Sequence, residues 1–147
     1  MMLADLTSGA LPPGRYRLSE SVTVRALRDE LAAADWLMRV VDGGTMTDRA
    51  SMFEEFAVAC DFPSWFGGNW DAFADCLRDL SWLPQQPLVI LWQRAGVFES
   101  RSPRMWEMAN TVIGSAIADR VEADLPSLYL LFPMDTTGRS DPGDGIL

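Results

Sequence analysis

Three aspartates recur at four-residue steps in one short stretch of the chain, and their spacing permits three kinds of chemistry. Asp71, Asp75 and Asp79 would share one face of a helix, because residues four apart are neighbours on a helix surface. Paired carboxylates can act as general acid and base when their environments differ, and carboxylate oxygens also bind divalent cations. On an exposed face, such groups can instead pair with the cationic groups of another protein.

The composition of the chain bears on these three alternatives. The chain has 147 residues, a formal net charge of −9, no histidine, and only arginine as a basic residue. Without histidine there is neither a histidine-activated nucleophile nor an imidazole ligand for a metal. An acidic chain without a basic run gains nothing from counterion release on DNA or RNA, so we expect no nucleic-acid partner. The charge favours a cationic protein partner, approached by electrostatic steering.

The acidic charge is concentrated around the three aspartates. Between Glu54 and Asp79, six acidic residues stand against Arg78 alone, so the net charge of this stretch is −5. Asp71 and Asp75 are like charges four residues apart, which destabilises an isolated helix by about 0.2–0.5 kcal/mol. The helix dipole accounts for Asp71 in the first turn but not for Asp75. This unfavourable placement indicates a functional role for Asp75.

A glycine-containing loop precedes the acidic helix and carries two aromatic residues. Trp65 and Phe66 stand before two glycines, and Asn69 is the predicted N-cap of a helix that runs to about Leu80. We expect at least one of the two rings to be exposed, as is typical of an interface anchor. The apolar residues of this helix fall opposite the aspartates, so we expect Cys76 to be buried.

Helices and strands alternate along the rest of the chain. Residues at helical spacing predict further helices over Val22–Ala34, from Thr47 or Asp48 to Pro63, and from Ser102 and Pro103 onward. Apolar runs predict buried strands at Trp36–Val41, Leu88–Trp92 and Leu128–Phe132, with a short edge strand at Tyr16–Leu18. Buried strands separated by helices indicate parallel pairing. The predicted fold is therefore α/β, a small three-stranded parallel sheet flanked by helices, with an N-terminal strand and helix extension.

The stretch from Pro63 to Leu77 reads PSWFGGNWDAFADCL, and its pattern is specific. It contains an aromatic pair, a glycine, any residue, an asparagine, an apolar residue, Asp-Ala, two variable residues and Asp-Cys-Leu. This order resembles the signature of the barstar family, the intracellular ribonuclease inhibitors. The succession of predicted elements from about Trp36 to Phe132 agrees with that family. The resemblance implies a barstar-like fold and a protein that binds and blocks the active site of a basic secreted ribonuclease inside the producing cell.

The resemblance also implies roles for single residues. Asp75 matches the family's central acid, which occupies the phosphate-binding site of the nuclease, and Asp71 matches a helper one turn earlier. Trp65 matches an aromatic residue that stacks against the catalytic groups, and Gly67 and Asn69 match a loop that faces the partner. The predicted partner-binding residues are Trp65, Phe66, Gly67, Gly68, Asn69, Asp71, Ala74, Asp75, Arg78 and Asp79, with Asp119 added as the candidate for a further acid in the late helix.

We expect one domain over residues 1–147, with an extension over 1–35, a barstar-like core over 36–135 and a flexible tail over 136–147. Cys60 and Cys76 match no zinc or redox spacing, so we expect free thiols, as is typical of a cytoplasmic protein. Neither a signal peptide nor an apolar run long enough for a membrane span is visible. We therefore expect a cytoplasmic monomer without cofactor, metal or catalytic residues.

Two other functions stay open from the sequence alone. The same fold could serve as an immunity or regulatory module that binds a different cationic toxin. The chain could also be an enzyme that uses the carboxylate pair of Asp71 and Asp75, with or without a metal ion. Turnover, or stabilisation by added Mg²⁺ or Ca²⁺, would favour the enzyme over either binding protein.

Overall fold

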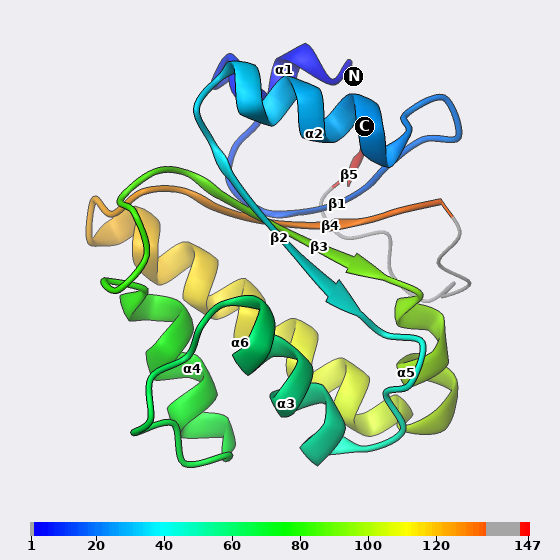
Figure 1. Ribbon diagram of the computed structural model, residues 1–147, viewed down its shortest axis with the longest axis vertical. Coiled ribbons are helices and arrows are strands. Elements are labelled where there is room, and N and C mark those ends of the chain that lie inside the picture. The colour runs from blue at the N-terminus through cyan, green and yellow to red at the C-terminus, as the bar shows by residue number, and fades with distance from the viewer. Residues whose placement is uncertain (1, 135–144) are drawn as a thin grey trace.

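A parallel sheet between two layers of helices forms the frame of the molecule (Figure 1). The computed structural model describes residues 2–134 and 145–147, and within them the sheet has five strands in the order β2-β3-β4-β1-β5. The strands are β1 (Arg15–Arg17), β2 (Leu37–Asp42), β3 (Leu88–Gln93), β4 (Leu128–Phe132) and β5 (Gly145–Ile146). One face is covered by α1 (Ala4–Thr7) and α2 (Val24–Ala33), and the other by α3 (Arg49–Ala59), α4 (Trp70–Asp79), α5 (Ala95–Arg101) and α6 (Pro103–Glu122).

Burial on both faces explains why the central strands are apolar throughout. Every residue of β4 is buried, and in β3 only the last residue is not. Alternate side chains serve two separate cores, because successive residues of a strand point to opposite faces. Ile90 and Leu130 pack in the core beneath α3 to α6, whereas Val89 and Leu131 pack in the core beneath α1 and α2. The predicted parallel α/β architecture is confirmed.

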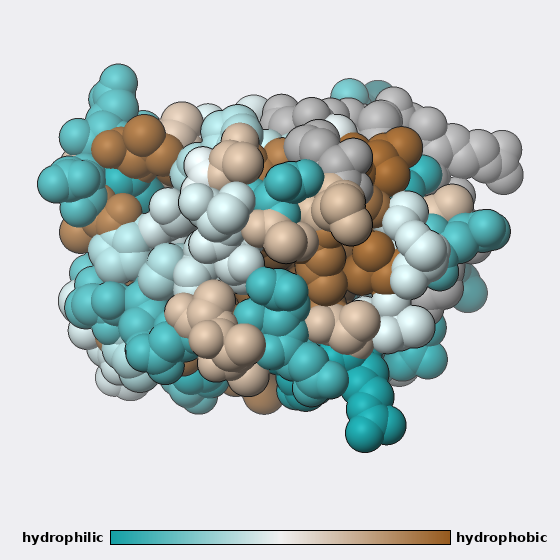
Figure 2. Space-filling view, turned by 90° about the horizontal axis from the view of Figure 1, so that it is seen from above, coloured by the Kyte–Doolittle hydropathy of each residue, from teal (hydrophilic) through white to brown (hydrophobic). Residues whose placement is uncertain are grey.

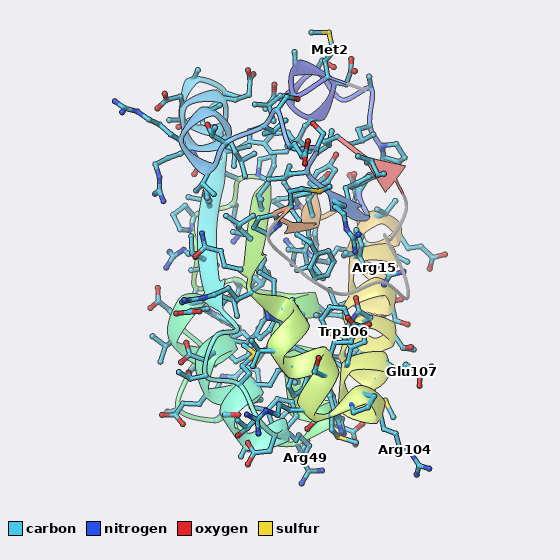
Figure 3. All side chains as sticks on the ribbon, turned by 90° about the vertical axis from the view of Figure 1, so that its right-hand side faces the viewer. Met2, Arg15, Arg49, Arg104, Trp106 and Glu107 are labelled. Carbon is cyan, nitrogen blue, oxygen red and sulfur yellow. The ribbon has the colours of Figure 1, made fainter. Side chains whose placement is uncertain are left out.

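The predicted number of strands in the sheet was wrong, because β1 and β5 extend the three predicted strands to five. The expected edge strand near Tyr16 lies inside the sheet, between β4 and β5. The hydroxyl of buried Tyr16 donates to the Pro12 carbonyl at 2.7 Å, and Arg15 reaches α6, where it donates to Asn110 at 3.0 Å (Figure 3). These contacts draw the first residues of the chain into the sheet.

The expected flexible tail over 136–147 ends in ordered structure. Residues 136–144 lie outside the described part of the chain, but residues 145 and 146 form β5 and Leu147 is buried. The Leu147 amide donates to the Arg17 carbonyl at 2.7 Å, and its carbonyl accepts from the Ser19 amide at 2.6 Å. Seen from above, this side of the molecule mixes hydrophilic and apolar residues, with one apolar group right of the centre and another near the left edge (Figure 2).

Four of the six helices in the described residues agree with the sequence prediction, but α1 and α5 were not predicted. The helix α5 directly precedes α6. Ser102 ends α5 and begins α6, but its hydroxyl donates to the Thr47 carbonyl at 2.8 Å instead of capping the helix. Pro103 occupies the first turn of α6, as predicted. The cap of α3 is Asp48, whose carboxylate accepts from the Ser51 amide at 2.9 Å.

A tight turn after β2 directs the chain into α3. Asp42 accepts the Gly44 amide at 2.9 Å and the Arg94 guanidinium at 2.6 Å, and this hydrogen bond from Arg94 lowers the pKa of Asp42. Gly43 lies against the end of β3. A Cβ atom there would stand 2.7 Å from the Arg94 carbonyl oxygen and 2.8 Å from that of Gln93. Only glycine fits, because both obstructing atoms belong to the backbone.

We predict that Gly43→Ala lowers the free energy of unfolding by about 1–3 kcal/mol, the usual cost of forcing atoms into a packed site. Thermal unfolding would measure this as a lower Tm. Gly114→Ala, at a helical position whose nearest neighbour would be 3.9 Å away, is the matched control and should leave Tm unchanged or raised. A Gly43 variant as stable as the parent would contradict the close contact.

Candidate functional site

The acidic helix α4 is set by its own sequence at both ends. The Asn69 side-chain oxygen accepts the Ala72 amide at 2.8 Å and so caps the first turn. Leu80 follows the last turn in the left-handed conformation, with φ 50°. Phe73, Cys76 and Leu77 form the buried face. The predicted helix from Asn69 to Leu80 is confirmed, and the aspartates lie on its exposed side.

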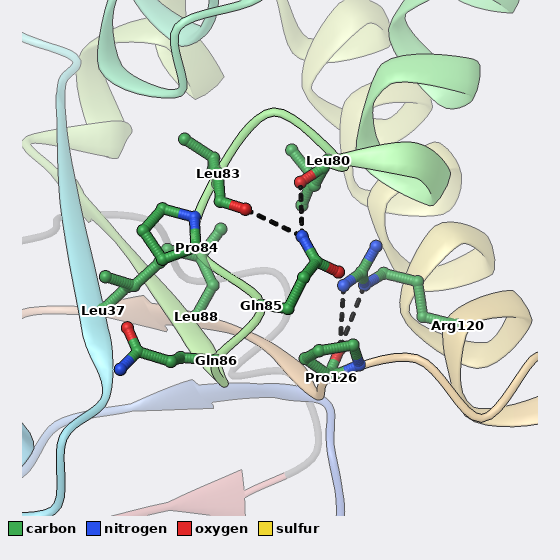
Figure 4. Close-up of a pocket in the computed structure, with 9 residues that line it drawn as sticks. All are labelled: Leu37, Leu80, Leu83, Pro84, Gln85, Gln86, Leu88, Arg120 and Pro126. Carbon is green, nitrogen blue, oxygen red and sulfur yellow. Dashed lines mark hydrogen bonds between the residues drawn. The ribbon is translucent and has the colours of Figure 1, made fainter.

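The buried Arg120 of α6 holds the carboxyl end of α4. Arg120 is only 3% exposed. Its guanidinium donates to the carbonyls of Arg78 at 3.0 Å and Asp79 at 3.1 Å. It also donates to the Pro126 carbonyl at 2.9 Å (Figure 4). Burial lowers the pKa of Arg120, and the nearby Asp79 carboxylate opposes that shift. A cation thus meets the negative end of the helix dipole.

The loop that leaves α4 is closed by Gln85. The Gln85 amide donates to the carbonyls of Leu80 at 3.2 Å and Leu83 at 2.8 Å (Figure 4). The cavity between this loop and Arg120 measures about 10 Å³, which is about the space of one water molecule. It is a packing gap behind the helix, and the acidic side chains lie outside it.

The loop before α4 divides its two aromatic residues between solvent and core. Trp65 is 54% exposed, and its ring packs edge-on against Trp82 with 6.1 Å between centroids. The Trp82 indole N–H donates to the Cys60 carbonyl at 2.9 Å, which fixes the ring that supports Trp65. Phe66 is half-buried and packs edge-on against Phe53 at 5.7 Å. Phe66 anchors the loop, and Trp65 faces outward.

The glycines of this loop keep it open to solvent. Gly67, Gly68 and Asn69 are all exposed. Gly68 adopts φ +68°, a conformation that glycine tolerates without strain. The Asn69 oxygen is engaged in the helix cap, so its amide nitrogen is the group that lies toward Gly67. The loop therefore offers backbone groups and one side-chain amide beside Trp65.

Arg78 links the acidic helix to an acid on α6. Arg78 forms an ion pair with Asp75 on its own helix, and its other terminal nitrogen lies 3.6 Å from an oxygen of Asp119. Asp71 and Asp79 are exposed and form no ion pair with another described residue. The structure thus brings Asp119 to the predicted site, although 40 or more residues separate it from the other site residues.

The predicted site residues lie on α4 and on the loop that leads into it, except Asp119, which lies on α6. Exposed members are Trp65, Gly67, Gly68, Asn69, Asp71, Asp75, Arg78, Asp79 and Asp119, whereas Phe66 and Ala74 are half-buried. Sequence reasoning missed two supporting residues, Trp82 and Arg120. A signal for Arg120 existed, because it continues the buried stripe of α6 at three residues after Ile117.

The three aspartates do not converge on one point. Helix geometry spreads Asp71 and Asp79 about 12 Å apart along the axis. Within residues 2–134 and 145–147, no group of three or more His, Cys, Asp or Glu side chains is placed to hold a metal ion. Among the same residues, the helices are too short or too polar to cross a bilayer.

The fold and the site define a class of protein, an α/β domain that presents an acidic helix beside an exposed tryptophan. A family model described as Barstar (barnase inhibitor) matches residues 25–132, most of the chain. The chain belongs to this family of ribonuclease inhibitors. A search of curated proteins finds no match. The family match includes α2, which the sequence placed in an extension, and leaves α1, β1 and β5 outside it.

The two cysteines are free and buried beneath the site. Burial raises the pKa of Cys76 to about 11, and the carboxylates of Asp75 and Asp79 add to that shift. Burial likewise raises the pKa of Cys60 to about 12. Both groups are therefore thiols at neutral pH, and thiols are far less nucleophilic than thiolates.

We predict slow modification of both cysteines by a thiol reagent at pH 8 in the folded protein, and rapid modification of both in urea. In the unfolded chain each thiol ionises near pH 9, whereas in the folded chain it stays protonated. The unfolded state therefore binds fewer protons above pH 9. Each thiol then lowers the free energy of unfolding by up to about 1.4 kcal/mol per pH unit until its folded pKa is reached.

Denaturant titrations at pH 7, 9 and 10.5 would measure this slope, and Cys76→Ala should reduce it. Rapid labelling of native Cys76 would contradict the buried orientation of this helix face.

Proposed function

We propose that the chain inhibits a basic secreted ribonuclease inside the producing cell by covering the enzyme's phosphate-binding site with α4. The observation that carries this proposal is the exposure of Asp75 and Asp71 on a helix held rigidly from behind by Arg120. A rigid helix keeps its carboxylates at fixed spacing, so little ordering cost accompanies binding. The carboxylates would take the place of substrate phosphates.

The neighbouring loop supports the same mode of binding. Trp65 presents a large ring at low cost in conformational entropy, because Trp82 already restrains it. Exposed tryptophans are frequent among residues that dominate interface energies. The exposed Gly67 and Asn69 allow a partner to approach the backbone closely. We propose that Trp65 packs on the nuclease while Phe66 serves to hold the loop.

We predict that Asp75→Ala weakens inhibition of purified barnase by about 2–5 kcal/mol, since cations in the enzyme's phosphate site would be left buried and unpaired. Stability should change by no more than about 0.5 kcal/mol, because the lost pair with Arg78 is offset by relief of repulsion from Asp71 and Asp79. Titrated inhibition and thermal unfolding of both proteins would test this.

Asp29→Ala is the matched control, because Asp29 is an exposed acid on α2, across the sheet from α4. It removes the same charge and should leave inhibition nearly unchanged. Equal inhibition by the parent and the Asp75 variant would refute the central role of Asp75. Binding of a different cationic toxin, with no effect on the nuclease, would instead support an immunity module.

We also predict that the association rate falls steeply as salt rises from low to physiological concentration, while the dissociation rate changes little. The acidic stretch between Glu54 and Asp79 attracts a basic partner over distances that salt screens, the Debye length being about 8 Å at 0.15 M. Stopped-flow association with barnase at several salt concentrations would measure this. A flat association rate would remove electrostatic steering from the mechanism.

A further inference from the structure

The central acid of the proposed interface already has a cationic partner within the free chain. Arg78 lies one turn after Asp75 on α4, and the two side chains form an ion pair. A partner whose cations bind Asp75 therefore competes with Arg78 for the Asp75 carboxylate. Arg78 is the only basic residue between Glu54 and Asp79, so it stands alone among six acids.

The carboxylate of Asp119 is a second possible ion-pair partner for Arg78. The guanidinium offers one terminal nitrogen to Asp75 on α4 and the other to Asp119 on α6, the latter at 3.6 Å. All three side chains are about half exposed, at 43% for Arg78, 58% for Asp75 and 48% for Asp119. The guanidinium is partly open to solvent, so rotation of the side chain can shift it toward Asp119 while the helices stay in place.

The backbone of Arg78 is fixed even though its side chain is not. The Arg78 carbonyl accepts a hydrogen bond from buried Arg120 at 3.0 Å. Because α6 also carries Asp119 one residue before Arg120, the same contact sets the distance between Arg78 and Asp119. The contact between α4 and α6 thus keeps Arg78 within reach of Asp119.

We propose that Arg78 competes with the nuclease for Asp75, and that Asp119 receives Arg78 when the nuclease takes its place. This inference rests on the proposed function. Asp119 then acts as a positioning residue for Arg78 and does not contact the partner. Exposed ion pairs are weak, so the competition lowers affinity by about two- to fivefold.

The arrangement would select among cationic partners. A single exposed cation on a partner gains no more from Asp75 than Arg78 already supplies, so the exchange is neutral. A phosphate-binding site that offers several desolvated cations forms stronger, charge-assisted hydrogen bonds and displaces Arg78. Competition from Arg78 thereby disfavours the binding of weakly basic partners. Specific binding often depends on an unfavourable interaction of this kind, which penalises the wrong partner.

A double-mutant cycle with purified barnase tests this assignment. The variants are Arg78→Gln, Asp119→Asn and the two combined, with Arg28→Gln and Glu122→Gln as controls that change the charge equally at exposed positions. Affinities would be measured at low salt. Arg78→Gln should tighten binding about two- to fivefold beyond Arg28→Gln, because Asp75 is released.

Asp119→Asn separates the positioning role from a direct contact. In the parent it should weaken binding about twofold beyond Glu122→Gln, since Arg78 then stays on Asp75. In the Arg78→Gln background, Asp119→Asn should change the affinity only as much as Glu122→Gln does. The Arg78 guanidinium is then absent, so Asp119 has no side chain to accept. Equal weakening in both backgrounds would show that Asp119 touches the nuclease, and weaker binding by Arg78→Gln would show that Arg78 does. Either result overturns the inference.

A measurement on the free protein distinguishes failure of this inference from failure of the proposed function. Side-chain carboxyl ¹³C signals of Asp75 and Asp119 should shift in Arg78→Gln, whereas that of Asp71, which has no ion pair with a described residue, should not. If these shifts occur and no variant binds barnase, the proposed function fails for this nuclease although the pairing stands. If Asp75 and Asp119 do not respond, the inference fails whatever the binding result.

Discussion

One buried cation determines where the acidic helix lies. A buried charge destabilises a fold unless its hydrogen-bonding groups are satisfied, and Arg120 donates to the carbonyls of Arg78, Asp79 and Pro126. These contacts join the end of α4, the body of α6 and the loop before β4. Because backbone oxygens satisfy the guanidinium, no carboxylate of α4 has to turn inward to neutralise it. The acidic side chains of α4 stay exposed, and the hydrogen bonds from Arg120 hold the end of the helix that carries them.

The local features of α4 were readable from the sequence because each depends on neighbours in the chain. The cap at Asn69 and the apolar face with Cys76 follow from residue type and helical spacing, and both are correct. That one aromatic ring of the loop would be exposed was also predictable. Residue type and spacing alone did not show which ring it would be, because Phe53 from α3 decides that Phe66 turns inward. Likewise the pairing of Arg78 with Asp75 follows from spacing alone, whereas its approach to Asp119 needs two helices to meet.

The errors concern pairings between distant parts of the chain. A two-residue strand such as β5 has no periodicity to detect. The strand near Tyr16 was expected, but its three residues do not show that it pairs with β4, so the sheet was predicted with three strands. The inward position of Tyr16 depends on β4 and β5 together. Arg120 was overlooked for a different reason. A charged residue within an apolar helical stripe is commonly assigned to the surface, although its register points it into the core.

The position of β1 in the sheet has a consequence for biosynthesis. β1 emerges from the ribosome well before both of its neighbours in the sheet, because β4 and β5 follow it by more than 100 residues. Pairings so distant in sequence form slowly. Until those strands appear, Leu27 and Leu31 of α2 have only part of their core to cover them. Arg120, which steadies α4, is also translated late. The surface proposed to bind the nuclease therefore takes its final shape only after Arg120 and β4 have been synthesised.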